Sequence, residues 1–224
     1  MRGAGVWQRL WRRAPELVPM LDGYARWAPA YPPRPHNPLM ATEAAVVGPM
    51  LMMAAPRRAL DVGTGTGRNI ELLTAAGAQT IVGVDLSASM LSRWTHHAAR
   101  VLGDARSLPF ASGTFDVVCA SLMCGDVPDL GAWIGEASRV LGRGGHLVYS
   151  DFHPSWSREG WRRTFTGADG REYELPLHPH GIEQHLDLLA ANDLDVRTIR
   201  EPKIPGGHTP VVVVLHAIKL QRTR

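Results

Sequence analysis

Cysteine is scarce in this 224-residue sequence, which contains only Cys119 and Cys124. Their spacing provides neither a disulfide framework nor a CxxC metal motif, so a reducing cytoplasm is the expected location. Long hydrophobic runs are lacking too: the longest apolar stretches, such as 46–55, are short and interrupted by proline, which argues against a membrane span. We therefore expect a cytoplasmic protein with no membrane partner.

An excess of one charge is also missing. The 24 Lys and Arg residues nearly balance 21 Asp and Glu residues, and the formal net charge of +3 gives little support for a nucleic-acid partner. The most basic cluster, "WQRLWRR" at 7–13, is interpreted as an amphipathic helix that packs its apolar side chains onto the body. Binding of RNA or of a membrane surface is the alternative use of this cluster.

Short strand-like patterns alternate with helical ones between residues 57 and 152. This alternation predicts an α/β fold with a Rossmann-like, doubly wound, mostly parallel sheet. The expected strands are 58–62, 80–85, 100–103, 115–121 and 145–151, and the expected helices are 68–76, 88–99 and 129–141.

The flanking regions complete a single predicted domain, 1–224, around this cofactor-binding core (56–152). Residues 1–55 are expected to form a helical cover, with a helix that starts at Asn37 and Pro38 and is kinked or ended by Gly48–Pro49. Residues 153–180 are expected to insert a lid, with a hairpin (162–175) around Asp169–Gly170. The last region, 181–224, is expected to add a helix near 180–191 and strands at 194–200 and 211–218.

Three glycines at alternate positions follow the first expected strand of the core, in "ALDVGTGTG" (59–67). Gly63, Gly65 and Gly67 leave room for a ligand to approach backbone N–H groups at a strand-to-helix turn. The pattern is neither GxGxxG nor a phosphate-binding P-loop. Asp61, two residues before the first glycine, would repel a pyrophosphate and would suit a cationic ligand such as a sulfonium.

Acidic residues also end the next two expected strands. Asp85 can accept both hydroxyls of a ribose, and Asp104 can accept a hydrogen bond from an adenine amine while the Ala105 backbone takes a ring nitrogen. Taken alone, each of these acids is also typical of a helix cap or of a solvated turn, which would need no ligand. The three acids together, one of them before GxGxG, predict a site for a cationic adenosine compound.

At this point the sequence resembles the class I S-adenosylmethionine-dependent methyltransferases, and in particular the small-molecule enzymes of the menaquinone/biotin-pathway type. The resemblance implies a seven-stranded sheet with an antiparallel last strand, S-adenosylmethionine as the cofactor, and methyl transfer to an O, N or C atom of a small metabolite. It is carried by "YARWAPAY" (24–31), "ALDVGTGTG" (59–67), "VGVDLSASML" (82–91), "GDARSLPFASGTFDVV" (103–118) and "EASRVLGRGGHLVYSDFHP" (136–154).

The resemblance also implies which residues hold the cofactor. An aromatic segment folds over it, the glycines line its methionine portion, and the acids hold its ribose and adenine. The implied residues are Tyr24, Tyr31, Asp61, Gly63, Thr64, Gly65, Gly67, Asp85, Leu86, Met90, Asp104, Ala105, Arg106 and Ser121.

Methyl transfer needs a general base only if the acceptor starts protonated. The candidates are Asp126, Asp151 and His153, which follow the fourth and fifth strands; Asp126 stands where relatives commonly carry a histidine. Capping or solvation is the other interpretation of these side chains. No metal is expected, because "HPHGIEQH" (178–185) lacks HExxH spacing and is expected to line the acceptor pocket or begin a helix.

Other functions stay open as alternatives. The same fold can hold the cofactor without transferring its methyl group, as in cyclase-like or decarboxylase-like enzymes, or serve as a non-catalytic scaffold. A nicotinamide-dependent oxidoreductase is a third class. Nucleic acid is disfavoured as the acceptor because "SLMCGDVP" (121–128) lacks the Asn/Asp-Pro-Pro-aromatic run of amino-directed nucleic-acid enzymes. The sequence assigns neither the acceptor nor an oligomeric state.

Overall fold

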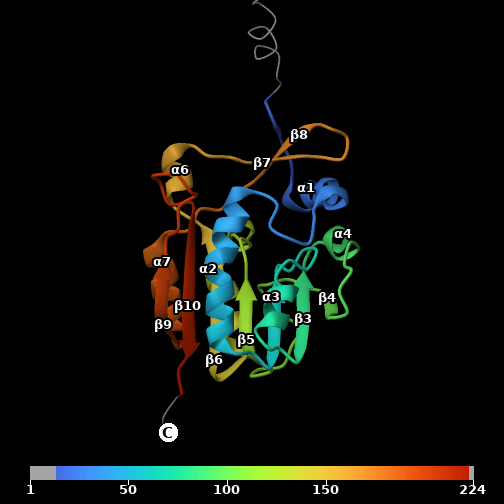
Figure 1. Ribbon diagram of the computed structural model, residues 1–224. Helices are drawn as coiled ribbons and strands as arrows, with labels where there is room; N and C mark the ends of the chain where they lie inside the picture. The colour runs from blue at the N-terminus through green and yellow to red at the C-terminus, as the bar shows by residue number, and fades with distance from the viewer. Residues whose placement is uncertain (1–13, 222–224) are drawn as a thin grey trace, which may run out of the picture.

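The central element of the fold is a seven-stranded sheet, seen in a computed structural model that describes residues 14–221 (Figure 1). The predicted amphipathic helix at 7–13 lies outside the described residues. The strand order is β4-β3-β2-β5-β6-β10-β9. The strands are β2 (Arg58–Val62), β3 (Thr80–Asp85), β4 (Ala99–Leu102), β5 (Phe115–Ala120), β6 (Leu141–Phe152), β9 (Leu194–Arg200) and β10 (Val212–Lys219).

The strand directions confirm the predicted mostly parallel sheet with an antiparallel last strand. Strands β2 to β6 pair in parallel, whereas β10 runs antiparallel to both of its neighbours, β6 and β9. After β2 the chain adds β3 and β4 on one side, and it then returns to add β5 and β6 on the other. The point between β2 and β5 is therefore the topological switch point at which open α/β sheets bind ligands.

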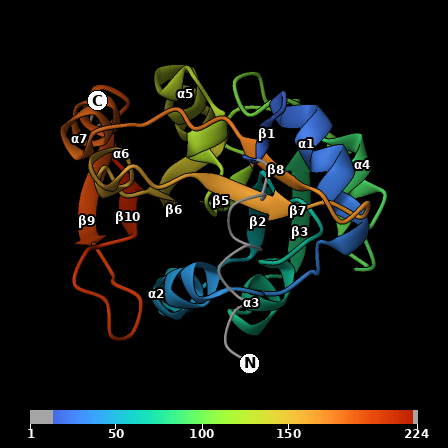
Figure 2. The same ribbon diagram turned by 90° about the horizontal axis from the view of Figure 1, so that it is seen from above.

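Helices cover both faces of this sheet, as Figure 2 shows. Helices α2 (Pro38–Ala54) and α3 (Ile70–Ala75) cover one face, and α5 (Leu130–Val140) and α7 (Ile182–Ala191) cover the other. Alternate residues of a strand point to opposite faces, so Val117 packs into one apolar cluster and Val118 into the other. Burial on both faces explains the continuous apolar runs of the central strands.

Two helix predictions differ from the structure. The helix expected over 88–99 is wrong in length, because α4 (Ala88–Leu91) is a single turn and the chain then folds back. The Trp94 indole donates to the carbonyl oxygen of Ala98 at 3.0 Å and packs against Gly83, and this turn replaces further helix. Of the two effects predicted for Gly48–Pro49, an end of the helix there is wrong: α2 continues to Ala54, because Met50 and Leu51 beyond the proline are buried against the sheet.

A small second sheet lies over the carboxyl ends of β2, β3 and β5 (Figure 1). It consists of β1 (Glu16–Leu17), β8 (Glu172–Leu175) and β7 (Arg163–Thr166), in the order β1-β8-β7. Strands β7 and β8 confirm the predicted hairpin, and Gly170 in its turn has φ +76°. Helix α1 (Met20–Trp27) lies beside this sheet, and α6 (Ser155–Glu159) precedes the hairpin.

No helix within residues 14–221 has the length and apolar character needed to cross a membrane.

Candidate functional site

A cavity of about 780 Å³ lies at the carboxyl ends of the central strands, and residues of the small sheet and of α1 also line it. It contains the switch point between β2 and β5, since both Val62 and Ser121 line it. Most of the sequence-predicted cofactor residues line this one cavity. They are Tyr24, Tyr31, Gly63, Thr64, Gly65, Asp85, Leu86, Met90, Asp104, Ala105, Arg106 and Ser121.

The glycine-rich turn that follows β2 forms one wall of the cavity. Gly63 has φ +66° and Gly65 has φ +58°, values that favour glycine, and a Cβ atom on Gly63 would overlap with the Met123 side chain. Gly67 has φ +94° but does not line the cavity; a Cβ atom there would overlap with the His96 ring. Gly67 therefore makes room for the segment after α4. It was predicted to line the ligand space, and the structure does not place it there.

Asp61 lies beneath this turn and is completely buried. It accepts hydrogen bonds from Thr64 Oγ1 at 2.6 Å, from Asn69 Nδ2 at 2.9 Å and from Cys119 Sγ at 3.3 Å. Burial raises the pKa of Asp61, against these hydrogen bonds, which lower it. The expectation that Asp61 faces a cationic ligand is corrected: Asp61 holds the turn in shape and does not line the cavity.

Asp85 ends β3 and does face the cavity. One carboxylate oxygen accepts the backbone N–H of Gly65 at 2.7 Å, and the other accepts that of Ser87 at 2.7 Å. Burial raises the pKa of Asp85 to about 6. Asp85 therefore fixes the glycine-rich turn while a carboxylate oxygen stays available to a ligand, because each oxygen has two lone pairs.

Asp104, after β4, is held by its neighbour Arg106. The Arg106 Nη2 atom lies 2.6 Å from Asp104 Oδ2, and its Nε lies 3.0 Å from Oδ1. This hydrogen-bonded pair lowers the pKa of Asp104. Asp104 is thus ionised and oriented at the rim of the cavity, next to Ala105.

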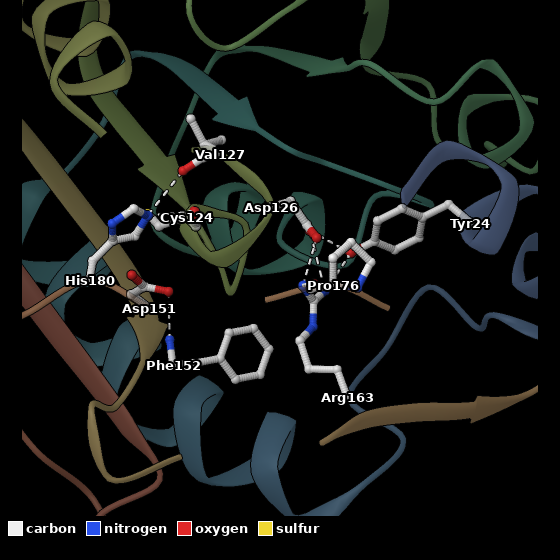
Figure 3. A network of polar contacts seen from close by, with 9 residues as sticks. All are labelled: Tyr24, Cys124, Asp126, Val127, Asp151, Phe152, Arg163, Pro176 and His180. Carbon is white, nitrogen blue, oxygen red and sulfur yellow. Dashed lines mark hydrogen bonds and ion pairs between the residues drawn. The ribbon is translucent and has the colours of Figure 1, made fainter. Parts of the chain in front are cut away.

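Asp126 is the one predicted base candidate that lines the cavity, and its carboxylate is already engaged (Figure 3). Arg163 Nη1 donates to Asp126 Oδ1 at 2.6 Å, and the Tyr24 hydroxyl donates to Oδ2 at 2.7 Å. Arg163 Nη2 also donates to the Tyr24 oxygen at 2.9 Å. The three side chains join the small sheet, α1 and the 3-10 helix η3 (Cys124–Asp126), so Asp126 holds the cover in place rather than standing free as a base.

The other two base candidates do not line the cavity. Asp151 is buried, with Oδ2 at 3.2 Å from His185 Nε2 and Oδ1 accepting the backbone N–H of Phe152. His153 Nε2 lies 2.8 Å from Glu201 Oε2, and its Nδ1 accepts the backbone N–H of Ser155. These contacts tie β6 to α7, through His185, and tie the residue after β6 to the segment after β9, through Glu201.

The sequence reasoning missed two side chains of the cavity wall. Arg163 and Arg68 line it, and each forms a buried ion pair, with Asp126 and Glu43 respectively. Within the group 178–185, which was expected to line the acceptor pocket or begin a helix, His178 lines the cavity, whereas His180 binds backbone carbonyls and His185 binds Asp151. Among residues 14–221 no cluster of three or more His, Cys, Asp or Glu side chains has the arrangement of a metal site.

The half of the cavity beyond β5 and β6 is mostly apolar and aromatic. It is the space in which a second ligand could lie beside one held at β2, β3 and β4. Its lining includes Phe152, Trp156, Trp161, Ile204 and Val211.

Comparison with known proteins identifies the domain that builds this cavity. Residues 60–149 match the family model described as a methyltransferase domain. The chain therefore contains a domain of the S-adenosylmethionine-dependent methyltransferase type. The matched residues of this methyltransferase domain include the glycine-rich turn and both acidic strand ends, Asp85 and Asp104.

Two named relatives illustrate the match. The chain is 35% identical over 183 residues to a malonyl-[acyl-carrier protein] O-methyltransferase from Legionella pneumophila, covering 76% of this chain and 61% of that protein. It is 39% identical over 109 residues to a demethylmenaquinone methyltransferase from Thermus thermophilus, covering 45% of this chain and 49% of that protein. The chain spans between 55% and 61% of the length of the first curated relatives it matches.

Solved structures share the fold of the methyltransferase domain. An S-adenosylmethionine-dependent methyltransferase from Mesorhizobium loti superposes with a TM-score of 0.61 at 20% identity, covering 88% of this chain and 99% of the other. The N-methyltransferase NodS from Bradyrhizobium japonicum, in complex with S-adenosyl-L-homocysteine, gives a TM-score of 0.64 at 14% identity, covering 83% and 89%.

The cavity of this chain fits S-adenosylmethionine, the cofactor of the family. The bare backbone of Gly63 and Gly65 permits close approach, and Asp85 presents a carboxylate oxygen to the same space. The rings of Tyr24, Trp27 and Tyr31 also line it, and aromatic faces attract a cation such as a sulfonium.

Proposed function

We propose that this chain transfers a methyl group from S-adenosylmethionine to an O, N or C atom of a small molecule. The observation that carries the proposal is the shared cavity in which Gly63, Gly65, Asp85 and Asp104 line one end and apolar side chains line the other. One end suits an adenosine compound and the other suits an acceptor with an aromatic or alkyl body. Relatives of this chain are named as methyltransferases of malonyl-[acyl-carrier protein] and of demethylmenaquinone.

When bound, S-adenosylmethionine supplies a methyl carbon already activated by its sulfonium. The chain's own contribution is alignment and exclusion of water, and oriented proximity contributes roughly 7–11 kcal/mol to such reactions. Asp85 would accept hydrogen bonds from the ribose hydroxyls and Asp104 from the adenine amine, and Leu86 and Met90 would line the space for the cofactor. The small sheet and α1 form the lid that the contacts of Arg163 hold over the cavity.

For an acceptor whose nucleophilic atom starts protonated, we propose His178 as the proton acceptor. Its backbone N–H donates to the carbonyl oxygen of Gly125 at 2.9 Å, which fixes it next to η3 on the cavity wall. In the part of the chain that the structure describes, neither of its ring nitrogens has a hydrogen-bond partner, whereas Asp126, Asp151 and His153 all have theirs. A proton that leaves an O–H or N–H group in the cavity can therefore move to the His178 imidazole.

The proposal extends to location and partners. A cytoplasmic protein with a small-molecule acceptor and no nucleic-acid partner is supported by two free thiols and by the near balance of charges.

The test has a binding arm and a product arm. Calorimetric titration should show binding of S-adenosylhomocysteine and no binding of NAD. Asp85→Asn should weaken the binding of S-adenosylhomocysteine at least tenfold. Asp195→Asn, the same change in an exposed ion pair, should leave this affinity unaltered. A metabolite extract incubated with methyl-labelled cofactor should yield a labelled product. Binding without labelled product would instead support a non-methylating enzyme or a scaffold, and binding of NAD alone would support an oxidoreductase.

A further inference from the structure

Three histidines of the segment 178–185 have different surroundings, and the function described so far uses only His178. His180 and His185 are buried, with 5% and 0% of their surface exposed, and neither lines the cavity. A buried imidazole costs stability unless its nitrogens are hydrogen-bonded, and an apolar side chain would avoid that cost. The contacts of His180 therefore need a reason beyond the filling of space.

His180 donates to two backbone carbonyl groups of one short turn. Its Nε2 atom lies 3.0 Å from the carbonyl oxygen of Val127 and 3.2 Å from that of Cys124 (Figure 3). Carbonyl oxygens only accept hydrogen bonds, so Nε2 carries the proton and shares it between the two. Cys124 is the first residue of η3, and Val127 follows its last residue, Asp126. His180 thus holds η3 at both ends.

The backbone that leads into η3 is strained. Leu122, two residues before the turn, has φ +56°, a value that residues other than glycine rarely adopt. Such a conformation persists only where the surrounding contacts over-determine it, and it occurs preferentially at functional sites. The N–H of Leu122 donates to Ser150 Oγ at 2.9 Å, and His180 supplies the next two side-chain contacts along the chain. The turn is therefore held in place from outside.

His180 is itself positioned by other buried side chains. Its ring meets the His185 ring edge to face, with the centroids 5.9 Å apart and an angle of 84° between the planes. His185 Nδ1 lies 3.0 Å from the Tyr149 hydroxyl, and His185 Nε2 lies 3.2 Å from Asp151 Oδ2. Tyr149 and Asp151 both belong to β6. The central sheet consequently determines where the His180 ring lies.

The η3 turn in its turn fixes two groups of the cavity wall. The Asp126 carboxylate binds Arg163 and Tyr24 of the lid. The carbonyl oxygen of Gly125 accepts the backbone N–H of His178 at 2.9 Å. A shift of η3 would therefore move the lid contact and the His178 imidazole together.

We infer that His180 is a positioning residue for methyl transfer: its Nε2–H fixes η3, and η3 fixes the acceptor end of the cavity. The inference rests on the proposed function, because a methyl-transfer rate is what reports it. His180 acts only through η3, since it does not line the cavity. Its loss should spare the cofactor end, where Gly63 and Asp85 belong to the segments of β2 and β3.

The test removes the donor and keeps the ring. His180→Phe retains an aromatic ring against His185 and cannot donate to the two carbonyl groups. With a metabolite extract and saturating methyl-labelled cofactor, the rate of labelled product should fall at least about tenfold, because small misplacements of a reacting group are costly. The Kd of S-adenosylhomocysteine should change less than about threefold, because separate sites respond independently. Each rate is expressed per cofactor site counted by calorimetry, so a misfolded fraction cannot produce the loss.

Two further variants separate positioning from stability. His180→Gln keeps an amide N–H near the place of Nε2, and it should restore most of the rate that His180→Phe loses. Leu141→Ala opens a void at the buried amino end of β6, at the opposite edge of the sheet from the cavity. It should lower the unfolding temperature and leave the rate per cofactor site unchanged. If His180→Phe yields no folded protein, His180→Asn, whose shorter amide does not reach both carbonyl groups, replaces it.

The possible outcomes separate the inference from the proposed function. A His180→Phe rate equal to that of the wild type, or a His180→Gln rate as low as that of the variant without the donor, would overturn the inference. An equal loss of rate in Leu141→Ala would also overturn it, since stability alone would then explain the loss. If the wild type itself forms no labelled product, the proposed function fails and the inference fails with it.

Discussion

Replacement of Asp85 by Asn should stabilise the free protein while it weakens the cofactor site. Asp85 is a carboxyl group whose pKa is raised from 3.8 to about 6 by burial at the end of β3. The folded protein therefore binds a proton more tightly than the unfolded chain does. Stability falls as the pH rises through the window between these two values, and the loss is complete above pH 6.

The size of the effect follows from the difference between the two pKa values. At 1.36 kcal/mol for each pH unit, ionised Asp85 costs up to about 3 kcal/mol at pH 7.5 and about 1 kcal/mol at pH 4.5. These figures are upper bounds, because the group keeps some contact with solvent. An asparagine amide resembles the protonated carboxyl group, since each has one oxygen to accept the N–H of Gly65 or Ser87. The variant should gain the corresponding free energy of unfolding.

Urea unfolding, monitored by tryptophan fluorescence at pH 7.5 and pH 4.5, measures the difference in free energy of unfolding between the variant and the wild type. We expect Asp85→Asn to exceed the wild type by up to about 3 kcal/mol at pH 7.5 and by about 1 kcal/mol at pH 4.5. Asp195→Asn, in an exposed ion pair with Arg197, should stay within about 0.5 kcal/mol at both values. An Asp85 variant less stable than the wild type at pH 7.5, or a gap that does not shrink on acidification, would refute the reasoning.

Three further changes test the lid contact, the turn and the proton acceptor. Arg163→Met leaves the buried Asp126 carboxylate without its cation, so it should lower the free energy of unfolding by about 3–5 kcal/mol in urea titrations. Adding Asp126→Asn should recover part of this loss. An unchanged urea midpoint would contradict a stabilising role of the buried pair. Gly63→Ala forces a Cβ atom into the Met123 side chain at a positive φ, so it should cost at least about 1 kcal/mol and weaken S-adenosylhomocysteine binding in calorimetry. His178→Gln should leave that binding intact but slow formation of the labelled product, most at neutral pH; an unaltered pH–rate profile would remove His178 from the reaction.

Local signals in the sequence predicted the elements that build the cofactor end of the cavity. Asn37 and Pro38 predicted the start of α2, and in the structure Asn37 Oδ1 accepts the N–H of Met40 at 2.9 Å. An acid after an apolar run predicted Asp85 at the end of β3. Such features depend on neighbours within a few residues, so the sequence contains them directly.

Contacts between distant segments account for what the sequence did not predict. Arg163 lies in a hairpin and binds Asp126, 37 positions away, and no local pattern connects the two. Arg68 directly follows the GxGxG segment, and its sequence position does not indicate that its partner is Glu43 of α2. The shortened α4 has the same origin, because Trp94 and His96 leave the helix to fill the space above Gly83 and Gly67. Asp61, predicted from its position to face the ligand, is instead used by the turn itself.

The place of β10 in the sheet has a consequence for how the chain is made. Although β10 follows β9 in the sequence, it lies inside the sheet, and within residues 14–221 β9 pairs with no strand but β10. Until residue 219 has left the ribosome, β6 presents an open edge with unpaired N–H and C=O groups, and β9 has no strand to pair with. A nascent chain that stalls before this point would expose an unpaired strand edge to other polypeptides, so chaperones are expected to bind it until β10 has emerged.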